Sequence, residues 1–272
     1  MSQIRIGCQT YTWQMSLEKY RGQIGHILDV VSRAGFEGLE PEVCMLGPYE
    51  KDPGRLAEEL DERNVALAAL TLVLDWANPE ETEDEKEQAE RAMDYLRHFP
   101  GTLLLLCQMP GQDRSNLRER QANAIACVNA LARRAVERGI ASAFHPNSPP
   151  GSVFRTEQDY EMLLNGLDPE VVGFAPDVGH IVNGGMDAIR VCQTYRPLIR
   201  HVHFKDISQG GEWTAMGAGI IDFPGLVSVL QRTGYEDWIM VEEESVEAES
   251  DPDSVTLQNG EYVRETLLPL IR

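Results

Sequence analysis

Hydrophobic positions along the chain alternate between short runs rich in β-forming residues and longer stretches with the period of a helix. Most of the short runs are apolar on both faces, as the strands of a parallel sheet covered on both sides must be. Because helical stretches separate these runs, the pattern indicates parallel strands joined by crossover helices. Eight strands are predicted, at residues 4–10, 36–40, 66–74, 102–108, 140–145, 171–177, 199–204 and 237–242.

The helical stretches carry recognisable start and end signals. Gly35 is placed to end the first long helix, because glycine readily adopts the left-handed conformation of a C-terminal cap. Asp52, directly before a proline, is expected to cap the second helix. A long, regular helix is predicted over 116–138, and Thr156 and Asp222 are suited to cap the helices after strands five and seven.

Eight strands that alternate with helices favour a (β/α)8 TIM barrel formed by the whole chain as one domain, residues 1–272. The length agrees, since such a barrel takes about 250 residues. An open, doubly wound sheet shows a similar alternation and stays open as an alternative. The first strand is not followed by a GxGxxG turn, so the sequence does not support a dinucleotide site there.

Composition narrows the class of protein. With 24 Lys and Arg against 44 Asp and Glu, the formal charge is -20, which disfavours a nucleic-acid partner because phosphate binding depends on Lys and Arg. The first ten residues lack the apolar run of a signal peptide, and no 18-residue apolar stretch indicates a membrane span. The five cysteines are scattered and never form a CxxC pair. We therefore expect a cytoplasmic enzyme with reduced thiols and no membrane partner.

The predicted strands end on polar, often ionisable, residues. In a barrel these residues meet at the C-terminal mouth, where catalytic side chains are found. Four of them come from the last four strands and offer two imidazoles and two carboxylates: His145, Asp177, His203 and Glu242. Each alone is as readily a structural group, but together they predict one divalent metal ion. This mixture of ligands favours Mn2+ or Co2+, with Zn2+, Fe2+ or Mg2+ as alternatives, over Ca2+.

Several motifs carry a specific resemblance. DVGH at 177–180, HVHFKD at 201–206 and the segment 217–244 resemble the sugar phosphate isomerase/epimerase family with the xylose isomerase-like TIM barrel. QTYTW at 9–13 and GFEGLEPE at 35–42 are similar to the first two strands of that family. The resemblance thus extends over almost the whole chain.

The resemblance implies site residues. It places the metal on strands five to eight, here the four residues above, and substrate contacts at His180 and Lys205. Glu40 resembles a frequent acid of the family at the end of strand two. The chain departs from the family at strand five, where many epimerases place a metal-binding, proton-moving Glu and this chain has His145. A histidine there resembles the inosose dehydratase branch. A second departure is Ala218, where the family commonly has Glu.

The chemistry that follows begins with a keto sugar or related polyol whose vicinal oxygens bind the metal. An enediolate forms, and the cation and Lys205 stabilise its charge. Glu242 or Glu40 is expected to take the proton, and His180, near its ordinary pKa of about 6.5, to carry one to the product. We expect an isomerase or epimerase. A dehydratase or another β-eliminating lyase is the alternative, and a non-catalytic sugar-binding or accessory subunit is the second.

Aromatic and amide side chains near the strand ends are candidates for substrate contact, although each aromatic is equally suited to pack under a loop. The candidates are Tyr11, Trp13, Gln108, Asn147 and Trp213. Glu243 and Glu244 are expected to turn outward, and His201 to be structural. Few basic residues lie at strand ends, so a neutral sugar or polyol is expected rather than a phosphorylated one. Formation of a homo-oligomer stays open.

Overall fold

A closed ring of parallel strands forms the centre of the computed structural model, which describes residues 4–272. One sheet has the order β3-β2-β1-β11-β8 and the other β4-β5-β6-β7. Bridges from Glu42 to Thr71, Phe174 to Ile199 and Asp177 to His203 join the two sheets at both edges, which closes the barrel. The strands are β1 Arg5–Gln9, β2 Gly38–Glu40, β3 Ala66–Leu67, β4 Ala69–Leu74, β5 Leu103–Gln108, β6 Ser142–His145, β7 Val172–Phe174, β8 Val202–Phe204 and β11 Trp238–Val241.

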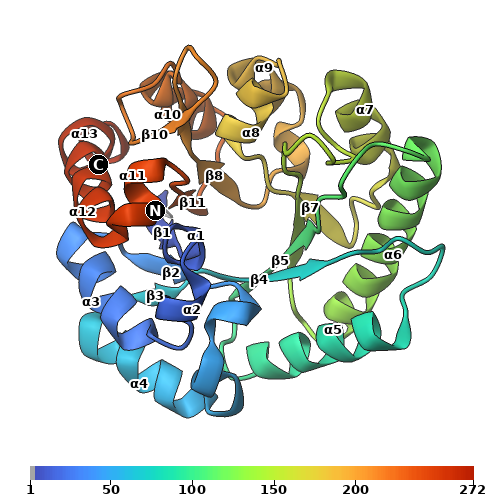
Figure 1. The fold of residues 1–272 in the computed structure, drawn as a ribbon, viewed down its shortest axis with the longest axis horizontal. Helices are drawn as coiled ribbons and strands as arrows, with labels where there is room; N and C mark the ends of the chain where they lie inside the picture. Colours follow the sequence, from blue (N-terminus) through green and yellow to red (C-terminus); the bar gives the residue numbers. More distant parts are fainter. Residues whose placement is uncertain (1–3) are drawn as a thin grey trace.

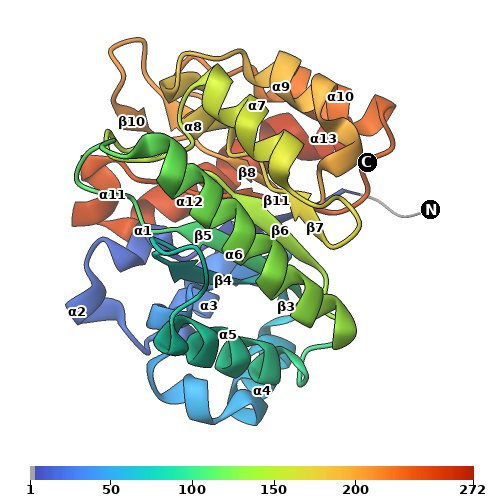
Figure 2. The ribbon, with the colours of Figure 1, turned by 90° about the vertical axis from the view of Figure 1, so that its right-hand side faces the viewer.

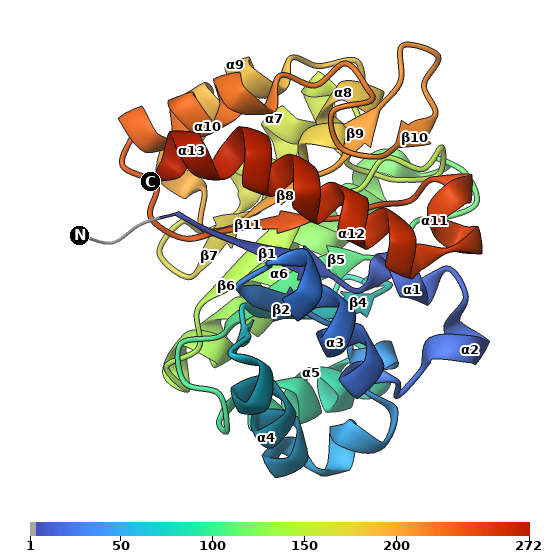
Figure 3. The same ribbon diagram turned by 90° about the vertical axis from the view of Figure 1, so that its left-hand side faces the viewer.

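Helices surround this barrel, as Figure 1 shows from one end and Figures 2 and 3 show from two sides. The α-helices are α1 Tyr11–Gln14, α2 Leu17–Tyr20, α3 Ile24–Ala34, α4 Pro53–Arg63, α5 Glu83–Leu96, α6 Leu117–Glu137, α7 Glu157–Gly166, α8 Val178–Asn183, α9 Ala188–Thr194, α10 Phe223–Arg232, α11 Val246–Ser250, α12 Pro252–Tyr262 and α13 Leu268–Ile271. The tighter or wider turns are η1 Val43–Met45, η2 Gly47–Lys51, η3 Arg196–Leu198 and η4 Val263–Leu267. Within residues 4–272, none of these helices is long and apolar enough to cross a bilayer.

The predicted strands and helix ends agree closely with the structure. Each predicted strand contains an observed one, and the stretch 66–74 is divided at Ala68 into β3 and β4. Gly35 ends α3 in the left-handed conformation at φ 86°, and the Asp52 side chain accepts a hydrogen bond from Arg55 N at the start of α4. Asp222 caps α10 in the same way, through Gly225 N. Local signals thus fix where most elements begin and end.

The floor of the barrel is apolar, and β11 contributes two large side chains to it. Trp238 and Met240 point inward, and Gly7 of β1 and Gly38 of β2 make room for them. A Cβ on Gly38 would lie 2.6 Å from the Trp238 ring, and one on Gly7 would lie 2.5 Å from Met240 Cε. Because side chains alternate along a strand, the next inward position of β11 after Met240 is Glu242. The apolar floor therefore ends where the polar mouth begins.

A small antiparallel hairpin after β8 was not expected from the sequence. It pairs β9 Asp206–Ile207 with β10 Trp213–Thr214. The Asp206 carboxylate fixes the returning loop, accepting hydrogen bonds from Gly217 N at 2.9 Å and Gly219 N at 3.0 Å. The last residue of the HVHFKD motif therefore holds the loop beside the barrel mouth, including the segment around Ala218.

Candidate metal centre

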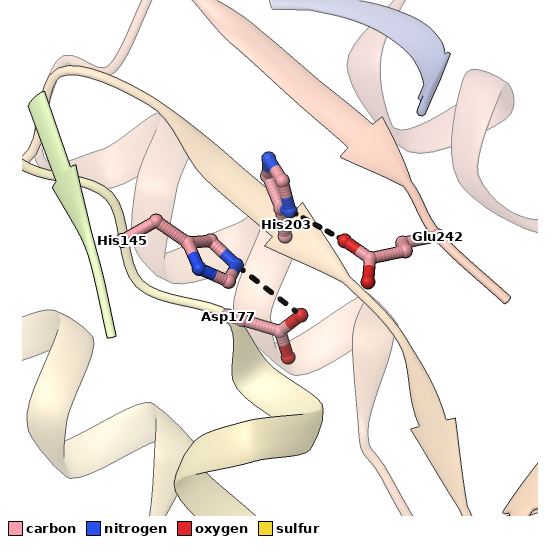
Figure 4. Close-up of side chains that lie close together, drawn as sticks. All are labelled: His145, Asp177, His203 and Glu242. Carbon is pink, nitrogen blue, oxygen red and sulfur yellow. Dashed lines mark hydrogen bonds and ion pairs between the residues drawn. The ribbon is translucent and has the colours of Figure 1, made fainter. Parts of the chain in front are cut away.

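The four predicted ligands converge at the C-terminal mouth, as Figure 4 shows. His145 ends β6, Asp177 follows β7 as the cap of α8, His203 lies in β8 and Glu242 follows β11. One ligand atom from each lies within 4.8 Å of the others. All four residues are buried, with exposures of 6% or less. Consecutive parallel strands thus bring together groups that are far apart in the chain.

The hydrogen bonds of this cluster are incomplete in a way that fits a divalent ion. His203 Nδ1 lies 2.9 Å from Glu242 Oε2, but His145 Nε2 is 3.7 Å from Asp177 Oδ2. Among residues 4–272, neither ring nitrogen of His145 has a hydrogen-bond partner, and Asp177 Oδ2 accepts none. Buried polar atoms are nearly always paired. A cation between these nitrogen and oxygen donors satisfies them, and such donors suit Zn2+, Mn2+ or Co2+.

The charges of the four groups balance one another without an ion. Burial and His203 act to lower the pKa of His145, but Asp177 raises it to about 9. Burial also acts against a charged His203, but Glu40 and Glu242 raise its pKa to about 10. Burial would raise the pKa values of Asp177 and Glu242, yet the neighbouring Lys205 holds both well below the usual range. Two protonated imidazoles thus balance two carboxylates, and a divalent ion can replace the two protons without changing the total charge.

Lys205 is a fully buried cation beside this cluster. Its Nζ donates to Glu242 Oε1 at 2.9 Å and to Glu244 Oε1 at 2.5 Å, and lies 3.3 Å from Asp177 Oδ2. The Trp213 ring lies 4.8 Å from the same nitrogen. Burial acts to lower the pKa of Lys205, but these carboxylates raise it well above its ordinary value. The side chain therefore stays positively charged at neutral pH.

His180 lies next to Lys205, and its protonation differs from the prediction. Its Nε2 is 3.0 Å from Lys205 Nζ, and its Nδ1 is 2.8 Å from Ser148 Oγ. Burial and the adjacent ammonium lower the pKa of His180 to about 3. The expectation that His180 titrates near 6.5 is therefore wrong. It is a neutral imidazole that accepts a hydrogen bond from Lys205.

Glu40 lies behind His203 and not at the surface of the cavity. Its carboxylate is fully buried and lies 2.6 Å from His201 Nε2 and 3.0 Å from His203 Nε2. Thr71 Oγ1 donates to it at 2.9 Å. Burial acts to raise the pKa of Glu40, and the two histidines hold it far below the usual range. Glu40 is therefore placed to orient His203, and it is not among the residues that line the cavity described below.

A cavity of about 490 Å³ opens over the cluster. Tyr11 and Asn147, two of the residues predicted to contact substrate, line this cavity. Gln108 lies at its side, where Nε2 donates to Asp75 O, and Trp213 packs against the His180 ring at 5.4 Å. The structure does not bring Trp13 to the cavity: it is 0% exposed and its Nε1 donates to Asp253 Oδ1 at 2.8 Å. Trp13 thus holds α12 against α1 instead of covering a sugar.

Two carboxyl groups in the cavity wall were missed by the sequence analysis. Glu244 was expected to face outward, but it faces the cavity and contacts Lys205, since alternation places residues 242 and 244 on the same side. Glu42 lies two residues after Glu40 and also lines the cavity. Its Oε2 accepts from Gln14 Nε2 at 2.9 Å, and burial raises the pKa of Glu42 to about 7. Glu243 faces away, where Asn259 donates to it.

Comparison with known proteins places this chain in a family. Residues 28–266 match the family described as "Xylose isomerase-like TIM barrel". The chain is 26% identical over 275 residues to an inosose dehydratase of Lacticaseibacillus casei, covering 88% of both chains. Two solved structures show the same fold. One is the IolI protein with a bound zinc atom, with a TM-score of 0.78, 17% identity and 98% coverage of both chains.

The other solved structure is a 3-keto-D-glucoside 4-epimerase from E. coli. It has a TM-score of 0.74 at 16% identity, covering 96% of this chain and 99% of that one. The family match over residues 28–266 covers most of the chain, and the two solved structures share its fold. The chain therefore belongs to the xylose isomerase-like TIM barrel family.

Proposed function

We propose that this protein is a divalent-metal-dependent lyase that acts on a keto sugar or keto-polyol. It removes the proton next to the carbonyl and expels an oxygen leaving group from the β-carbon, which is water in the simplest case. The observation that carries this proposal is the ligand set itself. His145 occupies the strand-five position where many epimerases of the family have a proton-moving carboxylate. The likeness to inosose dehydratases over 88% of the chain supports the same reaction class.

A divalent ion held by His145, Asp177, His203 and Glu242 would polarise the substrate carbonyl and make the adjacent C–H more acidic. Lys205 adds a second, permanent positive charge beside the oxygen on which negative charge develops. Both oxygens of Glu242 are already engaged, one by His203 and one by Lys205. Glu242 is therefore a ligand rather than a proton acceptor.

Glu42 is the better proton acceptor. It lines the cavity, and it is neither one of the four candidate metal ligands nor hydrogen-bonded to any of them. A pKa near 7 also suits a general base at neutral pH. When Glu42 takes the proton, the electron pair of the broken C–H bond forms the new C=C bond and the C–O bond to the leaving group breaks. The departing oxygen takes a proton from Glu244, whose pKa burial raises to about 7, while Lys205 keeps its charge.

A keto-sugar isomerase or epimerase is the second candidate. One observation favours it: Glu42 and Glu244 reach the same cavity from β2 and β11, which are separated by β1 in the barrel. Two carboxyl groups on different sides of a substrate suit proton removal from one face and return to another. The two reactions differ in the mass of the product.

The protein is first treated with a chelator and reloaded with Mn2+ or Co2+. Its turnover of inososes and ketoses in D2O is then followed by mass spectrometry. A lyase releases water, with a mass loss of 18 Da, whereas an isomerase keeps the mass and incorporates deuterium. Metal removal is expected to abolish either reaction, and Glu42→Gln to slow it with full metal occupancy. Full turnover by metal-free protein contradicts the proposal.

A further inference from the structure

A second cavity, of about 400 Å³, lies outside the barrel wall beside α5. Its floor is the outer face of β4 at Leu70, since the neighbouring Thr71 points inward to Glu40. Leu46 closes it on one side, and Ala92 and Tyr95 of α5 close it on the other. We call this cavity the α5 groove. Figure 1 shows the segment between β2 and α4 next to α5 in the outer ring of helices.

The α5 groove adjoins the 490 Å³ cavity over the candidate metal ligands, which we call the catalytic cavity. Val43, Glu50 and Gln88 line both, so the two spaces share a wall. From Gln88 to Tyr95 the groove follows α5 for ~10 Å, at a helical rise of about 1.5 Å per residue. The catalytic cavity alone already falls in the usual size range of small-molecule sites, about 300–1,000 Å³. A small polyol therefore does not account for both spaces.

The groove also contains an unsatisfied polar atom. Tyr95 is 7% exposed, and within the described part of the chain its hydroxyl has no hydrogen-bond partner. Burial and the charges of Asp52 and Glu50 raise the pKa of Tyr95, so the hydroxyl keeps its proton and can donate. The other buried walls, at Leu46, Leu70 and Ala92, are apolar, whereas the charged lining side chains, such as Glu50, Lys51 and Arg91, are exposed at the surface. The buried part of the groove thus offers apolar surface with one buried hydroxyl, which suits a hydrophobic group that carries an oxygen.

We propose that the α5 groove binds the apolar aglycone of a keto-glycoside whose sugar ring lies over the four candidate metal ligands. This inference rests on the proposed lyase function and specifies its substrate class. In a 3-keto-glycoside the proton leaves C2 and the C1–O bond to the aglycone breaks. The electron pair of the C2–H bond forms the C1=C2 double bond, and the aglycone leaves as an alcohol after taking a proton. The C3 carbonyl is retained, so the reaction needs no oxidant or reductant.

The experiment compares cyclohexyl and methyl 3-keto-β-glucosides, whose leaving alcohols are similar in acidity but differ in apolar volume. Release of alcohol is measured with Mn2+-loaded protein. We expect kcat/KM to be on the order of tenfold higher for the cyclohexyl substrate, given the value of burying that much apolar surface. Ala92→Leu fills the groove and is expected to remove this preference. Ala130→Leu, at an exposed position of α6, is the matched control and is expected to keep it.

Each outcome of this experiment either supports or overturns the proposed aglycone site. Equal kcat/KM for the two substrates overturns the inference, and so does a preference that survives Ala92→Leu in a folded, Mn2+-binding protein. If Ala92→Leu does not fold, Tyr95→Trp fills the same groove from another position. If neither glycoside is cleaved, the lyase proposal fails. The aglycone site is then tested separately, by measuring the binding of both glycosides with isothermal titration calorimetry. Tighter binding of the cyclohexyl compound that Ala92→Leu abolishes then supports the aglycone site, and equal binding overturns it.

Discussion

Metal binding is expected to release protons, because His145 and His203 carry them in the metal-free protein. Their pKa values are raised to about 9 and about 10, so both imidazoles are protonated at pH 7. The pKa values of Asp177 and Glu242 are held below the usual range, so these carboxylates have no protons to lose at that pH. An imidazole must lose its proton before it binds a metal, and we therefore expect about two protons to leave per Mn2+ bound.

The direction in which metal affinity changes with pH follows from the same two pKa values. Both pKa values are raised, so competition by protons is strong at pH 7 and disappears as the pH rises through 9 and 10. The values lie about two and three units above pH 7, and at about 1.36 kcal/mol per unit the competition weakens metal binding at pH 7 by roughly 7 kcal/mol relative to the deprotonated site. Between pH 7 and 9, affinity is expected to rise up to ~100-fold per pH unit.

Isothermal titration calorimetry of Mn2+ binding in buffers of different ionisation enthalpy measures this release directly. A plot of observed enthalpy against buffer enthalpy has the number of released protons as its slope. The matched variant His203→Gln retains one of the two imidazoles and is expected to release about one proton and to bind more weakly. Binding that releases no protons at pH 7, or an affinity that does not change from pH 6 to 9, would refute the reasoning.

Three further predictions follow from the contacts of single side chains. Lys205→Met should retain Mn2+ and lower kcat by ~100-fold or more, as metal analysis and turnover measurements show; unchanged kcat would exclude the role of Lys205 in stabilising charge. Glu40→Gln should lower the free energy of unfolding by ~3 kcal/mol in urea, because it breaks a buried ion pair with His203; a variant as stable as the wild type would argue against that pairing. Trp13→Phe loses the hydrogen bond to Asp253 and should cost about 1 kcal/mol of stability with KM unchanged; a raised KM would return Trp13 to the substrate site.

The barrel and the grouping of the four candidate metal ligands could be predicted from the sequence because both follow from local rules. Apolar runs bounded by capping residues define the strands, and the C-terminal ends of parallel strands meet at one mouth. His145, Asp177, His203 and Glu242 could therefore be grouped before any distance was known. Glu244 was within reach of the same reasoning, since alternation along β11 places it on the side of Glu242.

Other features depend on packing between distant segments and leave no local signal. Trp13 is turned from the cavity by a hydrogen bond to Asp253, 240 residues away. The low pKa of His180 requires the buried ammonium of Lys205 as its neighbour, and Glu40 is withdrawn from substrate by His201 and His203. None of these partners can be read from composition or spacing. The α5 groove likewise arises from how a helix sits against the barrel wall.

The distribution of roles around the barrel mouth has a consequence for how such proteins diversify. The candidate metal ligands come from the second half of the chain, on β6, β8 and the loops after β7 and β11, whereas Glu42, Val43 and Tyr11 approach the cavity from the first half. Mutations in the early loops are therefore expected to accumulate without disturbing these ligands. Substrate range can thus drift during evolution while the metal ligands are inherited intact. A mutant library confined to residues 43–53, which leaves the proposed base Glu42 unchanged, is expected to sample new specificities at little risk to catalysis.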